Sequence, residues 1–196
     1  MKGAFFGSSE EELQQFLIPL GNVSFDSNSI RFDNYPFGPS LVTTDPLVKA
    51  SDIINISTKS YRPTIRIGNE LIFIHAAQRE VLARFAEQNN IQLVDRPELW
   101  DWILEPFLDT EFTNEDKQRL YGLLLQFHLS RTDVDGLRAR VKGQMMKYNF
   151  DTMLWEWQMF SALDVLKAMR PKLSAAEFKE FYKEVMEIAL RPDVNE

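Results

Sequence analysis

The chain contains no cysteine among its 196 residues, and this absence excludes several kinds of chemistry. Disulfide frameworks, zinc sites with Cys ligands, iron–sulfur clusters and thiol nucleophiles all require cysteine. Glycine is scarce as well, with 8 residues, which is about half of its usual share of roughly 7%. No glycine-rich phosphate loop occurs, and the residues around Ser8 lack the Gly-x-Ser-x-Gly pattern of a nucleophile elbow. These absences disfavour nucleotide-binding proteins and serine hydrolases, and they favour helices.

Long hydrophobic runs are also missing. The apolar patch after Met1 is followed at once by the acidic run Glu10–Glu12, so it is too short for a signal-peptide core or a membrane span. We therefore expect a cytoplasmic protein without membrane insertion. Basic residues are in deficit, because 22 Lys and Arg stand against 29 Asp and Glu, and the formal net charge is −7. Non-specific nucleic-acid binding depends on clustered Lys and Arg, so we expect no nucleic-acid partner.

Short stretches with apolar residues at every second position occupy the region from Val23 to His75. This alternation, interrupted by Pro, Gly, Asn, Asp and Ser, is typical of strands with one buried face. The clearest candidates are residues 30–32, 48–56, 65–67 and 71–73. Between the last two, Gly68-Asn69 favours a tight hairpin turn. The first part of the chain is therefore predicted to contain a small antiparallel sheet.

Helical signals frame this region and dominate the chain after Ala76. Ser or Thr followed three residues later by an acidic residue is the pattern that begins helices, and it occurs at Ser9, Thr113 and Ser174. The predicted fold is α+β, with an N-terminal small antiparallel sheet and flanking helices, followed by a C-terminal bundle of about five helices. The change of pattern near Val94 divides an α+β region, 1–94, from an all-helical region, 95–196. The sequence is equally compatible with two separate domains and with a single α+β unit in which the two regions pack together.

The segment Asp133-Val134-Asp135-Gly136 has the acidic residues and the glycine of a calcium-binding EF-hand loop. With its glycine at the sixth loop position, however, Arg131 and Lys142 occupy the first and twelfth positions, where calcium needs carboxylates. The segment is therefore interpreted as a turn or cap before a helix. Asp151 is interpreted as the cap of the next and longest helix, which ends near Arg170.

Two histidines, His75 and His128, are the nitrogen ligands that a metal site in this chain would use. One lies at a predicted strand end and the other in a helix, and no His-x-x-Glu-His or Glu-x-x-His pattern accompanies either. We therefore predict no metal site and no cofactor.

The densest basic cluster lies on one predicted helix and comprises Arg138, Arg140, Lys142 and Lys147. Arg138 and Lys142 share one helix face, whereas Arg140 turns away from it. Such a pattern indicates a solvated helix side rather than a groove for phosphate groups.

All four tryptophans stand in two Trp-acid-Trp triplets, at residues 100–102 and 155–157. On a helix, residues i and i+2 point about 200° apart, so the two rings of one triplet cannot line the same wall. In the first triplet Trp102 continues the apolar stripe of Leu99 and Ile103. This predicts that Trp102 faces inward and that Trp100 lies on the outer face. The second triplet lies in a stretch that is apolar around nearly its whole circumference, which predicts a central, buried helix.

Three interpretations of the triplets compete. In the first, the tryptophans only pack the core. In the second, Trp100, Trp155 and Trp157 anchor a protein interface, and the protein is a binding or regulatory module that contacts another protein or a second copy of itself. In the third, an aromatic, carboxylate-bearing cleft around Trp155–Trp157 makes the protein an enzyme or a small-molecule binder, with Glu156 as general acid or base and Asp101 as second carboxylate. Because catalytic motifs are scarce, the sequence favours the binding module as the function.

Overall fold

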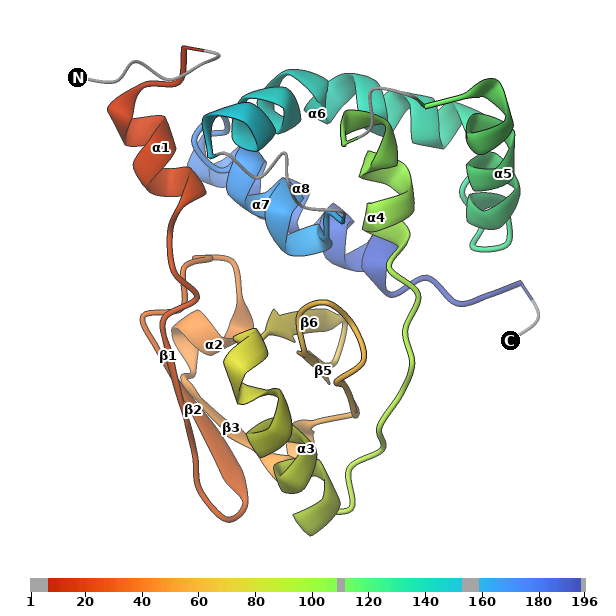
Figure 1. Cartoon of the computed structure of the whole chain (residues 1–196). Coiled ribbons are helices and arrows are strands. Elements are labelled where there is room, and N and C mark those ends of the chain that lie inside the picture. The colour runs from red at the N-terminus through yellow and green to blue at the C-terminus, as the bar shows by residue number, and fades with distance from the viewer. Residues whose placement is uncertain (1–6, 109–111, 153–158, 195–196) are drawn as a thin grey trace. The chain divides into compact units, whose positions relative to one another are not determined.

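The computed structural model describes residues 7–108, 112–152 and 159–194 (Figure 1). The chain divides into two compact units, each assembled from segments that are distant in sequence. Unit 1 consists of Met1–Ile18, Glu98–Phe181 and Arg191–Glu196, and unit 2 consists of Pro19–Pro97 and Tyr182–Leu190. The C-terminal helix α8 (Ala175–Ala189) therefore contributes its first half to unit 1 and its second half to unit 2.

Within the described residues, unit 2 holds two antiparallel three-stranded sheets, and the predicted α+β fold is confirmed. In the first sheet, β2 (Ser29–Asp33) lies between β1 (Asn22–Phe25) and β3 (Leu47–Lys49). In the second, β5 (Thr64–Ile67) lies between β4 (Asn55–Ser57) and β6 (Glu70–Phe73). Burial alternates along β2, as expected for a sheet with one solvated face, whereas all four residues of β6 are buried.

The hairpin predicted around Gly68-Asn69 is confirmed. β5 and β6 pair so that Ile67 lies opposite Glu70, which leaves Gly68 and Asn69 as the two turn residues. Gly68 has a φ of +53°, a left-handed conformation that glycine adopts at little cost.

The single strand predicted over residues 48–56 is wrong. Val48 belongs to β3 of the first sheet and Ile56 to β4 of the second. A 3₁₀ turn, Ala50–Asp52, separates them, and the Ile53 N–H donates to the Ala50 carbonyl within it. This local hydrogen bond interrupts the ladder and lets the chain leave one sheet and enter the next.

One short helix, a 3₁₀ turn and one longer helix accompany the sheets in residues 19–97 of unit 2. α2 (Leu41–Thr44) follows β2, and a 3₁₀ turn, Ala76–Gln78, leads into α3 (Arg79–Gln88). α3 buries Leu82, Phe85 and Ala86. After α3 the chain runs beside β4, where the Val94 N–H donates to the Ile56 carbonyl at 2.9 Å.

Side chains cover the outer edge of β6. The Leu71 N–H points to the Met186 sulfur of α8 at 3.4 Å, and the Phe73 N–H donates to the Tyr35 hydroxyl at 3.0 Å. Unpaired strand edges invite pairing with other chains, and these contacts protect the edge of β6. The Met186 contact also joins the second half of α8 to unit 2.

A buried carboxylate reinforces the same edge. Glu70 is 7% exposed and accepts hydrogen bonds from the Leu41 N–H at 3.0 Å and from the Tyr182 hydroxyl at 2.5 Å. Burial raises the pKa of Tyr182 and of nearby Tyr35 above the ordinary value, so both phenols keep their protons. The buried carboxylate of Glu70 and the Tyr182 and Tyr35 hydroxyls are thus each paired, as stability requires.

Unit 1 is helical in its described residues. Its elements are α1 (Glu10–Phe16), α4 (Leu99–Leu104), α5 (Asn114–Leu125), α6 (Arg131–Asp151), α7 (Ala162–Met169) and the first half of α8, with a 3₁₀ turn, Glu105–Phe107, after α4. α6 is the longest of them and packs against α4, α5 and α7. Among the described helices, none combines the length and the apolar character that a membrane crossing demands.

Most helices of unit 1 begin with the same device, in which the side chain of a Ser or Thr and an acidic side chain three residues later pair with the backbone. The structure confirms the starts predicted at Ser9, Thr113 and Ser174 and shows two more, at Ser130 and Ser161. The turn predicted at residues 133–136 is therefore wrong, because α6 begins at Arg131 and contains it. Asp151 is also not a cap of the next helix, since it is the last residue of α6.

Candidate functional site

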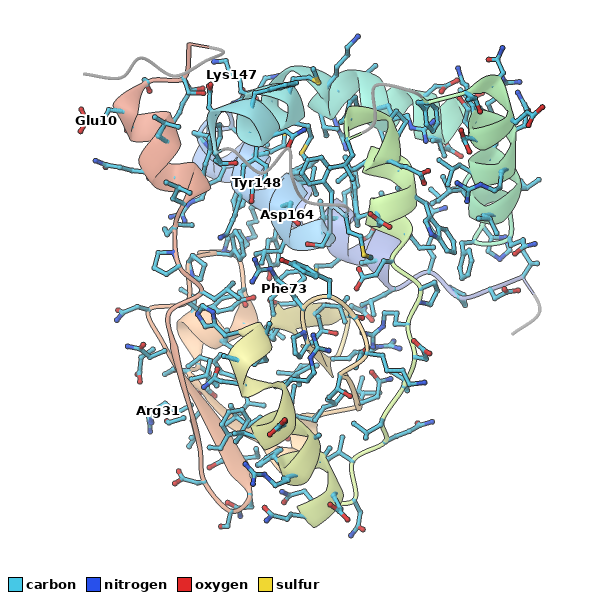
Figure 2. All side chains as sticks on the ribbon, viewed as in Figure 1. Glu10, Arg31, Phe73, Lys147, Tyr148 and Asp164 are labelled. Atoms are coloured by element: carbon cyan, nitrogen blue, oxygen red, sulfur yellow. The ribbon has the colours of Figure 1, made fainter. Side chains whose placement is uncertain are left out.

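Helices α6 and α7 bring a tyrosine and a buried carboxylate together in unit 1 (Figure 2). Asp164 on α7 is 7% exposed, and its Oδ1 accepts a hydrogen bond from the Tyr148 hydroxyl of α6 at 2.9 Å. Its Oδ2 accepts two more from Ser161, from the backbone N–H at 2.8 Å and from the hydroxyl at 2.6 Å. Three donors thus compensate for the burial of this carboxylate.

A second carboxylate, Asp101 of α4, lies at the start of α7. Its Oδ1 accepts a hydrogen bond from the Phe160 N–H at 3.1 Å. Burial raises the pKa of Asp101 from 3.8 to about 6; the Phe160 N–H opposes this rise, and the charges of Glu105, Glu98 and Asp164 add to it. Asp101 therefore exchanges its proton at a pH much closer to neutrality than an ordinary aspartate does.

Two aromatic rings pack against Tyr148, the hydrogen-bond partner of Asp164. The Tyr148 ring lies 6.3 Å from that of Phe160 and 5.5 Å from that of Phe16 on α1. A carboxyl group whose pKa is near 6, such as that of Asp101, can act as a general acid or base. Within residues 7–108, 112–152 and 159–194, no three His, Asp or Glu side chains gather to hold a metal ion.

The first tryptophan triplet is arranged in the opposite sense to the prediction. Trp100 is 1% exposed, so its predicted place on the outer face is wrong, and Trp102 is the half-buried ring. α4 buries Leu99, Trp100, Ile103 and Leu104. The buried face of α4 thus includes Trp100 as well as Leu99, and Trp102 lies at the edge of this face. Of the predicted site residues, Trp155, Glu156 and Trp157 lie outside the described residues.

Arg138 contradicts the solvated basic side that was predicted for α6. It is 8% exposed, and its guanidinium donates to the carbonyls of Ile103 at 2.8 Å and Trp102 at 3.1 Å. The same guanidinium lies over the Tyr121 ring at 5.4 Å. Arg138 therefore satisfies carbonyls at the C-terminal end of α4, where a cation also interacts favourably with the helix dipole.

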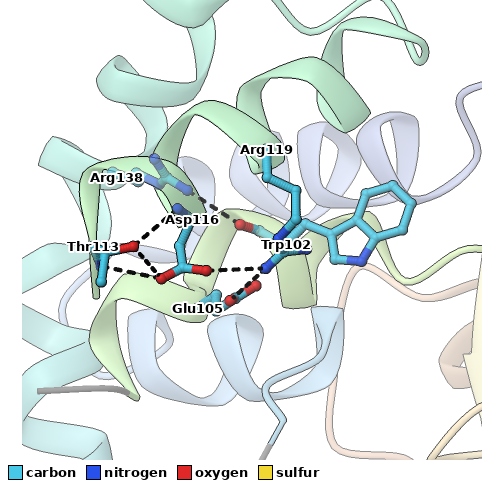
Figure 3. A network of polar contacts seen from close by, with 6 residues as sticks. All are labelled: Trp102, Glu105, Thr113, Asp116, Arg119 and Arg138. Atoms are coloured by element: carbon cyan, nitrogen blue, oxygen red, sulfur yellow. Dashed lines mark hydrogen bonds and ion pairs between the residues drawn. The ribbon is translucent and has the colours of Figure 1, made fainter. Parts of the chain in front are cut away.

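Charged side chains of α5 flank this contact (Figure 3). The Arg119 guanidinium lies 3.1 Å from a Glu105 carboxylate oxygen and 3.9 Å from one of Asp116. Asp116 also accepts a hydrogen bond from the Thr113 hydroxyl at 2.6 Å at the start of α5. Together with Arg138, this network fixes the backbone that carries Trp102.

Trp102 packs on the segment that follows α5, and that segment carries exposed apolar side chains. Its ring contacts that of Phe127 at 5.8 Å. Leu125, two residues earlier, is 61% exposed, and Val194, whose N–H donates to the Gln126 carbonyl, is 51% exposed. We call the set of Trp102, Leu125, Phe127 and Val194 the Trp102 surface. It joins α4, the end of α5 and the C-terminal segment.

The sequence contained signals for some of the residues that the prediction missed. The spacing of Ser161 and Asp164 is the same pattern that was recognised at Ser9, and it would have marked Asp164 as a helix-start residue. The partners of Arg138 and Tyr148 lie on other helices, 35 and 16 residues away in sequence. No pattern among neighbouring residues in the sequence predicts contacts between different helices.

No protein-family model, curated protein or solved structure matches this chain.

Proposed function

We propose that the protein is a cytoplasmic binding or regulatory module that acts by contact with another protein. The observation that supports this most directly is the Trp102 surface. Tryptophan is the side chain that most often dominates the binding energy of protein interfaces. Here a half-buried tryptophan packs on Phe127, and two large apolar side chains are exposed beside Phe127 along the backbone: Leu125, two residues earlier, and Val194, whose N–H donates to the Gln126 carbonyl. A partner would remove this apolar surface from water.

The surroundings of Trp102 support the same proposal. The hydrogen bonds from Arg138 hold the α4 backbone, and the contact with Phe127 supports the ring. A rigid anchor loses little conformational freedom on binding. Arg119, Glu105 and Asp116 form ion pairs beside the ring, and such a mixed polar rim is typical of protein interfaces. Interleaved charges of both signs suit a protein partner better than a phosphate backbone.

Substitution of Trp102 tests this proposal. The full-length chain and its Trp102→Ala variant would be used to capture partners from host cells, and the affinity of each captured protein would then be measured with purified components. We expect Trp102→Ala to weaken binding by at least about tenfold, the effect of 1.4 kcal/mol. Leu17→Ala is the matched control, since Leu17 is 65% exposed at the end of α1.

The possible outcomes distinguish a partner protein from self-association and from no role of the Trp102 surface. Equal binding by the wild type and by Trp102→Ala would refute the role of the Trp102 surface. Sedimentation of the purified chain tests self-association, and a dimer that Trp102→Ala dissociates would make the partner a second copy of the chain.

A second function has one specific observation in its favour, the carboxyl group of Asp101 with its pKa near 6. We propose as the alternative an enzyme or a small-molecule binder that uses the aromatic, carboxylate-bearing region at Asp101 and Trp155–Trp157. Native mass spectrometry would detect a retained small molecule, and binding would then be titrated in Asp101→Asn and Glu156→Gln. Unchanged binding in both variants would remove this alternative.

A further inference from the structure

A pocket lies between α3 and the β1–β2 hairpin of unit 2, outside the sites described above. Its volume is about 360 Å³, at the lower end of the range for ligand pockets. Its lining combines apolar and polar side chains. The lining residues are Phe25, Asp26 and Ser27 of the hairpin and Val81, Arg84, Phe85 and Gln88 of α3.

Two hydrogen bonds hold the hairpin against α3 on either side of the pocket. The Asn89 side-chain amide donates to the Ser27 carbonyl at 3.0 Å, and the Gln78 amide donates to the Val23 carbonyl at 2.9 Å. Between them, the rings of Phe25 and Phe85 pack 5.8 Å apart. The pocket is therefore formed before any ligand arrives, which limits the entropic cost of binding.

One residue that lines the pocket, Arg84, is a cation. Arg84 is exposed, and in the part of the chain that the structure describes its guanidinium takes part in no hydrogen bond or ion pair. A guanidinium matches a carboxylate with two parallel hydrogen bonds. Val81, one helical turn before Arg84, is 37% exposed and gives the pocket an apolar side chain on the same helix face as this cation.

We propose that this pocket binds a carboxylate carried by a small apolar or aromatic group. The apolar group would pack on Phe25, Val81 and Phe85, and the carboxylate would bind Arg84. Asp26, which also lines the pocket, repels groups with more than one negative charge, so the pocket selects a single carboxylate over phosphate. Two kinds of ligand carry such a carboxylate: a free organic acid and the C-terminal residue of a peptide.

Titration of the ¹⁵N-labelled full-length chain tests this inference, with amide chemical shifts as the readout. Phenylacetate probes the free acid, and a tripeptide, acetyl-Gly-Gly-Phe, probes a C-terminus. Each is compared with its neutral amide. We expect one or both acids to shift the amides of residues 25–28 and 81–89 in the millimolar range, and the neutral amides to bind roughly tenfold more weakly.

Variants identify the groups responsible. Arg84→Gln should weaken binding of the acid by roughly tenfold while leaving the neutral amide unchanged. Arg31→Gln, at an exposed arginine of β2, should have no effect. Asp26→Asn should strengthen acid binding and admit inorganic phosphate. The inference is overturned if neither acid shifts these amides, or if acid and amide bind equally well to both the wild type and Arg84→Gln.

Discussion

Replacement of Asp101 by asparagine is expected to stabilise the protein at neutral pH and to change its stability little in mild acid. Asparagine has nearly the same shape, and its carbonyl oxygen can still accept the hydrogen bond from the Phe160 N–H. The substitution therefore removes the charge and keeps the contact. Its effect reports how unfavourable the half-buried charge of Asp101 is in the folded protein.

The magnitude follows from the pKa. A carboxyl group whose pKa is 3.8 in the unfolded chain and about 6 in the folded protein makes folding less favourable above pH 6, by about 3 kcal/mol. Because Asp101 is partly exposed, water screens this charge, and we expect about 1–2 kcal/mol. Between these two pKa values the folded protein binds a proton that the unfolded chain has released. Stability therefore rises as the pH falls through 6 towards 4, and the advantage of Asp101→Asn disappears.

Urea denaturation at about pH 7.5 and about pH 4.5 measures this difference, with tryptophan fluorescence and circular dichroism as independent probes of a single transition. The control is Asp116→Asn, because hydrogen bonds from Thr113 lower the pKa of Asp116 and reverse the sign. That variant should be less stable than the wild type at both pH values. Equal destabilisation by Asp101→Asn at both pH values would refute the argument, since it would show that hydrogen bonding and not charge decides the role of Asp101.

Four further predictions concern stability and are measured by the same denaturation experiment. Trp100→Ala should cost about 3–5 kcal/mol, because it empties a buried aromatic site; a loss below about 1 kcal/mol would place the ring outside the core. Arg138→Lys should cost about 1.5–3 kcal/mol, since one ammonium cannot reproduce the guanidinium contacts with two carbonyls and a ring, and an unchanged midpoint would contradict this role. Gly136→Ala should stabilise by about 0.5–1 kcal/mol, because it lies inside α6 with nothing within 4 Å of the added Cβ. Gly21→Ala should destabilise strongly, since its φ is +79° and the added Cβ would lie 2.3 Å from the Asp33 carbonyl oxygen; the reverse order of the two glycine variants would refute both assignments.

The sequence predicted those features that depend on neighbours in the chain. The starts of α1, α5 and α8 follow from a Ser or Thr and an acidic residue three positions later, because both side chains reach the free N–H groups of the same first turn. The β5–β6 hairpin follows from Gly68-Asn69 between two apolar strands. Failures occurred where local signals conflicted. Residues 133–136 resemble a turn, but the stronger signal was Ser130 with Asp133.

The candidate site was less predictable, because its geometry depends on which helix face packs inward. Sequence reasoning selected Asp101 and correctly concluded that the two rings of the first triplet differ in environment. It then assigned the wrong ring to the core, because Leu99 and Ile103 are compatible with a stripe on either side. Packing with other helices of unit 1 decides which of the two tryptophans is buried. Local propensity cannot decide it, because residues 100 and 102 are the same amino acid on the same helix.

What the sequence by itself determined was composition, helix starts, the hairpin and the α+β class, all of which arise from interactions over a few residues. Only the tertiary structure decided that Arg138 is buried under the end of α4, that Asp101 meets the start of α7 and that α8 covers the edge of β6. Those contacts join residues separated by 35, 59 and 115 positions. Their formation depends on the burial of complete helix faces, a property of the assembled core and not of any single segment.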